Sequence, residues 1–225
     1  MLAVLYDIHG NLPALEAVLA AVEVERPQAL LLGGDYGTPS PWPRETLDRL
    51  RELDNATWIR GNGERWLREP PPDRPEVAEV YEAFVPGSLP EEELDWLFSL
   101  PEHAEVDGVL YVHGCVGRDD DSFAPEPQPE DEQRIGGEHD RTIVFGHSHQ
   151  QFRRPGPRGT YLINPGSVGL PLDGDRRAAW AVRTDEGEFA FRRSEYDIER
   201  AVAGWERFGG GFGEMVVRRL RLGRD

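Results

Sequence analysis

Five short apolar runs, several of them separated by helical patterns, dominate the first 150 residues. They span 2–6, 29–32, 56–59, 109–112 and 142–145. Leucine and valine recur at positions 12, 15, 19 and 22, one face of a helix, after Asn11 as a cap and Pro13 in the first turn. A second helix is expected around 44–53. Apolar runs that alternate with helices indicate β–α–β units, so we expect an α/β fold with a largely parallel sheet.

The rest of the chain adds helices and a second group of strands. Helical patterns lie at 76–84, 91–98 and 197–208, and strands joined by turns at 161–163, 178–183 and 188–193. These late strands are expected to pair antiparallel as a second sheet. With 225 residues, one well-cored domain over 1–208 is favoured over two small ones. Four glycines between 209 and 213 predict a flexible joint before an Arg-rich tail that completes 209–225.

The chain is strongly acidic, which limits its partners. Asp and Glu number 42 against 25 basic residues, for a formal charge of −17, and every base is Arg. Such a chain lacks the electrostatic footprint for duplex nucleic acid or a membrane surface. Nine acidic residues and three prolines fall in 118–140, which we expect to be a solvated excursion.

The expected location is the cytoplasm. The single cysteine, Cys115, cannot form an intrachain disulfide. The N-terminal run lacks a basic region and a cleavage site, and no run approaches the roughly 18 apolar residues of a membrane helix.

Each of the five apolar runs is followed at once by residues that bind metals. In chain order these are Asp7 and His9, Asp35, Asn62, His113, and His147 and His149. In open α/β sheets, ligands bind beyond the carboxyl ends of the strands, and glycines beside these residues allow sharp turns. The sequence therefore predicts that all seven side chains meet at one rim.

Two carboxylates, an amide and four imidazoles exceed the needs of one tetrahedral ion. They suit two adjacent divalent ions of Mn, Fe, Zn or Ni type. Paired ions about 3.5–4 Å apart can clamp the attacking and leaving oxygens of an in-line displacement at phosphorus. If the backbone is extended, residues i and i+2 point the same way, so both members of Asp7-x-His9 and of His147-x-His149 would face one ion.

Each motif also has a simpler reading on its own. The segments around Asp7, Asp35 and Asn62 could be turns or helix caps, and His113 a hydrogen-bonded histidine at a strand end. Jointly the metal-site reading is favoured, because four of the six histidines fall at these strand ends. The other two, His103 and His139, are expected at the surface.

The chain resembles the calcineurin-like metallophosphoesterase superfamily. That family has five motifs, all present here in the same order: Asp-x-His, Gly-Asp, Gly-Asn, a lone His and Gly-His-x-His. The similarity is to its small bacterial phosphodiesterase-like branch and extends through the loop at 164–167. The resemblance implies a two-sheet β-sandwich flanked by helices (αββα) and a dinuclear site whose metal-bridging hydroxide attacks phosphorus in line. It also implies two ligand sets, in which Asp35 bridges. These sets are Asp7, His9, Asp35 and His149 for one ion, and Asn62, His113 and His147 for the other.

Two positions depart from the family pattern. Many members carry a histidine after Gly-Asn that helps the leaving group depart, and here that residue is Gly63. Its loss favours diesters or activated esters over phosphoserine monoesters. The neighbouring Glu64 is expected to cap the next helix or to support the site. Tyr6 directly precedes Asp7, at a position where family members often have a serine. Its side chain is expected either to narrow the site from below or simply to pack within the sheet.

Four further residues are candidates for supporting roles. Arg60 and Arg118 could each contact phosphate, or could be ordinary surface residues. Asn164 and Ser167 could orient a histidine, or could simply form a turn.

The leading functional hypothesis is metal-dependent hydrolysis of a phosphodiester or small phosphoester, with Asp35, Asn62 and His113 at its centre and Mn²⁺ as the ion to test first. One alternative is a nucleotide or dinucleoside polyphosphate hydrolase, in which Tyr36, Trp42 or Trp66 would stack a base rather than serve the core. Another is a protein-binding scaffold with a weak site, which the complete ligand set disfavours.

Overall fold

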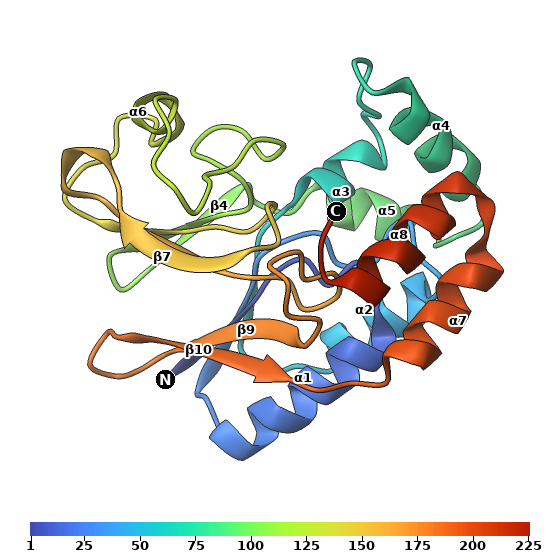
Figure 1. Ribbon diagram of the computed structural model, residues 1–225, viewed down its shortest axis with the longest axis horizontal. Helices are drawn as coiled ribbons and strands as arrows, with labels where there is room; N and C mark the ends of the chain where they lie inside the picture. Colours follow the sequence, from blue (N-terminus) through green and yellow to red (C-terminus); the bar gives the residue numbers. More distant parts are fainter.

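Two five-stranded sheets packed face to face form the centre of the protein, which the computed structural model describes over residues 1–225 (Figure 1). The first sheet has the order β10 (Phe189–Ser194), β9 (Ala178–Arg183), β1 (Leu2–Leu5), β2 (Ala29–Leu32) and β3 (Ala56–Trp58). The second has the order β4 (His103–Val106), β5 (Val109–Val112), β6 (Thr142–Val144), β8 (Tyr161–Pro165) and β7 (Gln151–Pro155).

Eight α-helices accompany the sheets. They are α1 (Leu12–Glu25), α2 (Pro43–Arg51), α3 (Asn62–Trp66), α4 (Pro75–Phe84), α5 (Glu91–Phe98), α6 (Asp131–Arg134), α7 (Ile198–Phe208) and α8 (Gly210–Leu222). None combines the length and apolar character that crossing a bilayer requires. The predicted αββα arrangement, a two-sheet sandwich flanked by helices, is confirmed.

Both sheets are mixed: the second has a parallel centre and two antiparallel edges, whereas the first is antiparallel only on the side of β9 and β10. In the first sheet β1, β2 and β3 are parallel, and in the second β5, β6 and β8 are parallel. The prediction that the late strands form a sheet of their own is wrong, because β9 pairs antiparallel with β1 and β8 joins β6. The reason is burial: residues 178–182 are all buried, so β9 needs cover on both faces. The mostly polar edge strands β4 and β7 carried no clear sequence signal.

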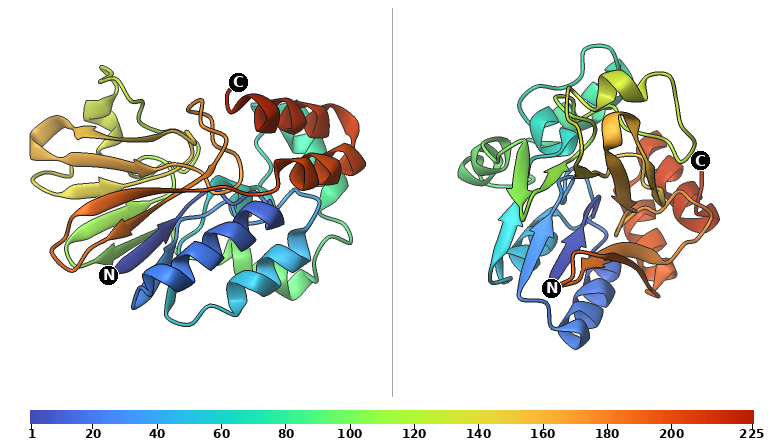
Figure 2. Two further views of the ribbon diagram at one scale, coloured as in Figure 1. Left: turned by 60° about the horizontal axis from the view of Figure 1, so that its bottom comes forward. Right: turned by 90° about the vertical axis from the view of Figure 1, so that its left-hand side faces the viewer.

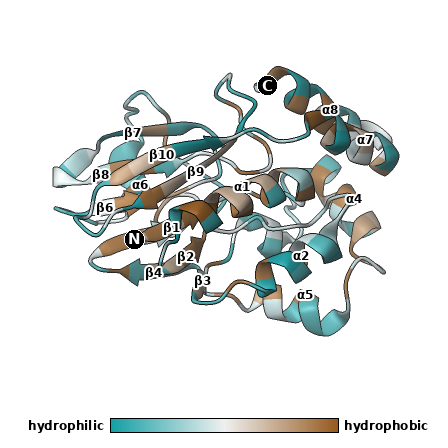
Figure 3. Cartoon of the chain, turned by 90° about the horizontal axis from the view of Figure 1, so that it is seen from below, coloured by the Kyte–Doolittle hydropathy of each residue, from teal (hydrophilic) through white to brown (hydrophobic).

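Alternation along β1 divides the core between two interfaces. Val4 packs between the sheets with Leu31, Tyr111 and Val144. Its neighbours Ala3 and Leu5 face the other way, against apolar residues of α1. In Figure 3 apolar colour concentrates in the central strands, whereas α2 and α5 carry many polar residues. This packing fixes the first sheet between helices on one face and the second sheet on the other.

The acidic segment 118–140 is docked on the outer face of the second sheet. Phe123 and Ile135 are buried there in a cluster with Phe145. Its acids are largely paired, as in Arg134 Nη2 to Asp121 Oδ1 at 2.9 Å. The expectation that segment 118–140 is a solvated excursion is therefore wrong where Phe123 and Ile135 anchor it. These two apolar side chains cover the outer face of the second sheet.

Helix α8 takes the place of the flexible joint and tail expected at 209–225. It lies beside α7 in both views of Figure 2 and packs on it through Val216 and Val217 against Val202 and Trp205. Gly209, with φ of +75°, makes the turn between the helices. Gly213 allows close packing, because a Cβ added there would lie 2.8 Å from the Trp205 carbonyl oxygen. The C-terminal segment is part of the fold.

Tyr6 fills the space between the sheets just below the loops that follow the strands. It is fully buried, and its hydroxyl donates to the Val144 carbonyl at 3.3 Å. A Cβ added at Gly33 would lie 2.2 Å from the Tyr6 ring, and one at Gly146 would lie 2.5 Å from it. Of the two roles considered for Tyr6, the structure shows the filling one.

We expect Gly33→Ala to lower the free energy of unfolding by about 1–3 kcal/mol, because the new methyl group overlaps the Tyr6 ring. Urea denaturation of the metal-free protein measures this. The matched control is Gly211→Ala, where nothing lies within 4 Å of the added carbon. Equal midpoints for the two variants would contradict the assignment of Tyr6 as a wedge between the sheets.

Candidate metal centre

Loops from both sheets meet beyond the carboxyl ends of their parallel strands. Backbone hydrogen bonds extend the first sheet into this region, from Asp7 N to Gly34 O at 3.2 Å and from His9 N to Asp35 O at 2.8 Å. The His147 N–H then crosses between the sheets to donate to Asp7 Oδ2 at 3.0 Å. As a result, all seven predicted ligand residues lie in one cluster.

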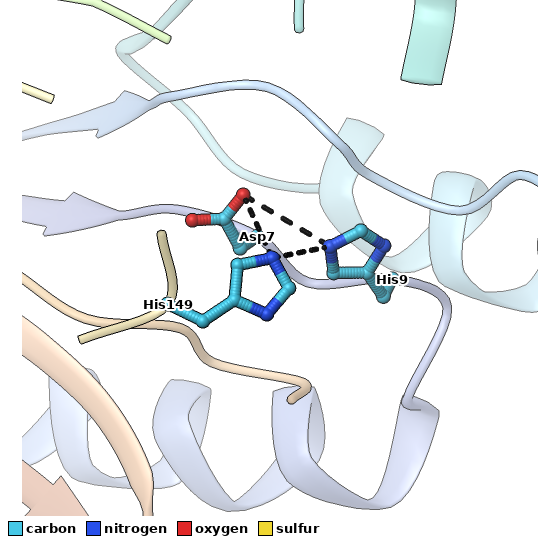
Figure 4. Close-up of side chains that lie close together, drawn as sticks. All are labelled: Asp7, His9 and His149. Atoms are coloured by element: carbon cyan, nitrogen blue, oxygen red, sulfur yellow. Dashed lines mark hydrogen bonds and ion pairs between the residues drawn. The ribbon is translucent and has the colours of Figure 1, made fainter. Parts of the chain in front are cut away.

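The first part of the cluster contains Asp7, His9 and His149 (Figure 4). Asp7 Oδ1 is 3.9 Å from His9 Nε2 and 3.6 Å from His149 Nε2. The two imidazole nitrogens are 3.0 Å apart. Three potential ligand atoms thus surround one point, at the spacing expected around a metal ion.

The second part contains His113 between the two carboxylates. Its Nε2 is 3.5 Å from Asp35 Oδ2 and 3.7 Å from Asp7 Oδ1. Asp35 Oδ2 is also 3.7 Å from His9 Nε2, so this carboxylate faces both parts of the cluster.

Asn62 joins the cluster through its amide oxygen. Asn62 Oδ1 lies 3.0 Å from His113 Nε2 and 2.8 Å from His147 Nδ1. With no cation between them, the opposite amide orientation would let the NH₂ group donate to both rings. The orientation with oxygen toward the rings is the one that suits a metal ligand.

Two backbone carbonyls orient the imidazoles. His113 Nδ1 is 2.8 Å from Gly33 O, and His149 Nδ1 is 2.8 Å from Leu170 O. Because a carbonyl only accepts, each ring carries a proton on Nδ1 and turns Nε2, the nitrogen that could bind a cation, toward the cluster. Every residue has a backbone carbonyl, so the sequence does not indicate that those of Gly33 and Leu170 would accept hydrogen bonds from His113 and His149.

The residues fit divalent cations well. Asp7 Oδ1 is fully buried and accepts no hydrogen bond, an arrangement that is unfavourable unless a cation is bound. Burial raises the pKa of Asp7 to about 8. Burial lowers the pKa of His113, but the charge of Asp35 outweighs it and raises that pKa to about 10. Mixed carboxylate, amide and imidazole donors suit ions of the Mn to Zn group.

The ligand residues have strained backbones. Asp7, His9, Asp35, His147 and His149 have φ of 53°, 48°, 56°, 65° and 57°. The expectation that Asp7 and His9 share a direction because their segment is extended is therefore wrong. Left-handed backbone at a non-glycine residue costs about 1–3 kcal/mol, and such residues concentrate at functional sites.

Glu64 ties together the loops after β2 and β3. Its buried carboxylate accepts from Asp35 N at 2.8 Å, Tyr36 N at 2.8 Å and Gly61 N at 2.9 Å. The Gly61 bond caps α3, which confirms the predicted capping role. The other two bonds were not anticipated, and they hold the backbone that carries Asp35.

Gly63 allows the backbone to approach Asp35 closely. Its N–H donates to Asp35 Oδ1 at 2.6 Å, and an added Cβ would lie 2.8 Å from that oxygen. A histidine at position 63 would have to displace Asp35. The nearest hydroxyl, Tyr81 Oη, is 3.4 Å from the added Cβ and already donates to Thr38 O at 3.1 Å.

The loop at 164–170 supports the ligand loops through backbone contacts. Ser167 Oγ donates to Asp7 O at 2.7 Å and accepts from Leu170 N at 2.7 Å. Asn164 Nδ2 donates to Gly146 O at 3.0 Å. Asn164 and Ser167 thus hold backbone rather than an imidazole ring directly.

The structure does not bring Arg60 and Arg118 into the cluster. The Arg60 guanidinium donates to Phe98 O and Glu102, each at 2.8 Å. Arg118 lines a cavity of 570 Å³ that His113 also borders, but its exposed guanidinium pairs with Asp120 at 3.2 Å.

The aromatic candidates for base stacking are occupied elsewhere. Tyr36 is fully buried, and its hydroxyl donates to the carbonyls of Leu32 and Ile59. Trp66 is in the main core, and the Trp42 ring packs on Gly204 of α7. Each has the structural role that the sequence left open. His103 and His139 are exposed, as predicted.

We expect Glu64→Ala to lower the free energy of unfolding by about 3 kcal/mol or more, because three buried N–H groups lose their acceptor at roughly 1–3 kcal/mol each. Urea denaturation without metal tests this. Glu79→Ala, at an exposed α4 position without an ion pair, is the control. Matching stabilities would show that the carboxylate does not hold the two loops.

Metal binding is expected to release roughly two protons per chain at pH 7, because His113 and Asp7 must both lose their protons to act as ligands. The apparent Mn²⁺ affinity should therefore rise between pH 6 and pH 9. Calorimetry in buffers of different ionisation enthalpy counts the protons. An affinity that is flat over this range would refute the assignment of these two groups as ligands.

Comparisons with known proteins place the chain among relatives. The uncharacterized protein MJ0912 of Methanocaldococcus jannaschii is 28% identical over 223 residues, spanning 89% of this chain and 90% of that protein. A metallophosphoesterase from Sphaerobacter thermophilus is 26% identical, with a TM-score of 0.78 and 99% of each chain covered.

The hypothetical protein PH1004 from Pyrococcus horikoshii shares the fold, with a TM-score of 0.81, 22% identity and 99% of each chain covered. Residues 1–187 match the calcineurin-like phosphoesterase superfamily domain, a range that includes every residue of the cluster. The chain therefore belongs to the calcineurin-like phosphoesterase superfamily.

Proposed function

We propose that this protein is a metal-dependent phosphoesterase that hydrolyses a phosphodiester or another small phosphoester. The observation that carries the proposal is one cluster of seven candidate ligand side chains. Four of them, His9, Asp35, His113 and His149, each have a donor atom within 4.8 Å of an Asp7 carboxylate oxygen, and Asp7 Oδ1 is buried without a hydrogen-bond partner. Family membership supports the same chemistry.

The ligands divide into two sets around Asp35. Asp7, His9 and His149 form one set, which is closed by the 3.0 Å approach of the two imidazoles. The second set consists of Asn62, His113 and His147, and Asp35 lies between the sets. Two divalent ions, when bound, supply Lewis acidity and an activated water. The protein's own part is to hold the donors in these directions through the carbonyls of Gly33 and Leu170.

The surroundings of Asn62 favour substrates whose leaving group needs no proton. Gly63 has no side chain, and both oxygens of Glu64 are used by backbone N–H groups. The Tyr81 hydroxyl is engaged with Thr38. No free acid is therefore offered from this side, which favours diesters and activated esters over alkyl monoesters.

The alternatives have weaker support. A nucleotide or dinucleoside polyphosphate would require a stacking surface, and Tyr36, Trp42 and Trp66 do not provide one. A protein-binding scaffold does not require seven retained ligands. The single Cys115 is buried and unpaired, which is in keeping with the cytoplasmic location that we propose.

We expect the Mn²⁺-loaded protein to hydrolyse a chromogenic diaryl phosphodiester and to hold two ions per chain by elemental analysis. Asp35→Ala should lower kcat/KM by more than about 100-fold, because it removes the carboxylate between the ligand sets. His103→Ala, at an exposed histidine outside the cluster, should match the wild type. Wild-type rates in Asp35→Ala would exclude the proposed site.

A further inference from the structure

The acidic segment 118–140 begins beside the metal centre, a few residues after His113. The chain turns back over Gly114, where an added Cβ would lie 2.3 Å from Asp121 O and 2.8 Å from Asp119 O. A residue with a side chain at this position would have to displace these carbonyls, so glycine permits the close approach. The start of the acidic segment is therefore packed against the strand end that carries His113.

The same stretch contacts the loops of the other two ligands in the second set. Asp119 O lies 3.2 Å from the Asn62 amide atom that faces the imidazoles. Ser122 Oγ donates at 3.0 Å to the carbonyl of Gly146, and Gly146 directly precedes His147. One short stretch of chain therefore touches all three loops that carry the ligands of this set.

A bidentate ion pair fixes this stretch to the helix that carries Asn62. Arg65 follows Asn62 by three residues on α3, and its Nε and Nη2 donate to Asp119 Oδ2 and Oδ1 at 2.8 and 2.6 Å. Two parallel bonds fix the orientation of the two groups as well as their distance. The side chains of Arg65 and Asp119 are only 24% and 20% exposed, so water competes less with this pair than with one on the open surface.

The first ligand set is held by a different part of the chain. Ser167 Oγ donates to Asp7 O at 2.7 Å, and the carbonyl of Leu170 lies 2.8 Å from His149 Nδ1. Because the two sets are supported by separate segments, removal of the Arg65–Asp119 pair should disturb the second set and leave the first in place.

We propose that the Arg65–Asp119 ion pair is a clamp that determines the affinity of the second metal site. Arg65 and Asp119 are positioning residues, which act by holding Asn62 in place relative to His113 and His147. This inference rests on the two-ion phosphoesterase proposed above, and it gives the acidic segment a role in that function. Removal of the groups that orient metal ligands typically weakens metal binding by about 10–100-fold.

The test is calorimetric titration of Mn²⁺ into Arg65→Ala and Asp119→Ala. Each variant should bind the first ion as the wild type does and the second ion about 10–100-fold more weakly. Arg65→Lys should be intermediate, because an ammonium cannot donate the same two parallel bonds. The double variant should lose no more affinity than either single variant, since both substitutions remove one and the same interaction.

Arg192→Ala is the matched control, because it removes an ion pair far from the ligands. Arg192 Nε donates to Glu25 at 2.6 Å in a partly buried pair, and Glu25 is the last residue of α1, whose other end lies beside His9. This variant should keep both Mn²⁺ affinities. Urea denaturation without metal should show similar, small losses of stability in Arg192→Ala and Arg65→Ala.

The outcomes separate the inference from the proposed function. If the wild type hydrolyses the diester while Arg65→Ala keeps both Mn²⁺ affinities, the inference is wrong and the function stands. If the second ion is lost selectively but the loaded wild type hydrolyses no phosphoester, the function is wrong and the clamp stands.

Three other results would overturn the clamp. Equal weakening of both ions in Arg65→Ala and Asp119→Ala would show that the pair supports the whole centre. Unfolding of both single variants before metal is added would make the pair a support for the fold. Binding of a single ion by the wild type would leave no second site for the pair to control.

Discussion

The close approach of Asp7, Asp35 and their imidazole partners is the constraint on which the rest of the structure depends. Carboxylate oxygens and ring nitrogens with lone pairs face one another within 4 Å in a buried space. Such a group is favourable only around positive charge, which protons supply in the metal-free chain and divalent ions supply in the loaded protein. The surrounding contacts hold these side chains in place. The carbonyls of Gly33 and Leu170 orient two imidazoles, and the side chains of Glu64 and Ser167 hydrogen-bond to the backbone of the loops that carry Asp35 and Asp7.

The acidity of the protein is compatible with an anionic substrate because the charges are separated. Only Asp7, Asp35 and Glu64 belong to the centre, and the two divalent ions that we propose would more than balance their charge. The acids of the docked segment beside the centre are largely held by Arg65, Arg118 and Arg134. The exposed surface is therefore negative, which disfavours binding of large polyanions but is compatible with the small phosphoester that we propose as substrate.

Sequence patterns predicted the strand ends and the convergence of their polar residues, because both are local properties of the chain. They could not predict which strands belong to which sheet, since the pairing of β9 depends on which elements of the folded protein bury its two faces. The left-handed backbones of the ligands carry no compositional signal. The carbonyls of Gly33 and Leu170 are invisible for the same reason. At the C-terminus, packing against Trp205 outweighs the low helix propensity of the glycines that begin α8.

The left-handed ligands have a consequence for how this fold can change over time. Each of the five holds a conformation that glycine adopts freely, so the wild-type residue makes the metal-free fold less stable than glycine would. Binding of ions is what offsets this penalty. In a lineage no longer selected for metal chemistry, drift at these positions toward glycine or asparagine would strengthen the scaffold while dismantling the centre. Retention of ligand side chains on unfavourable backbone would thus reflect a requirement for bound ions rather than for stability of the fold.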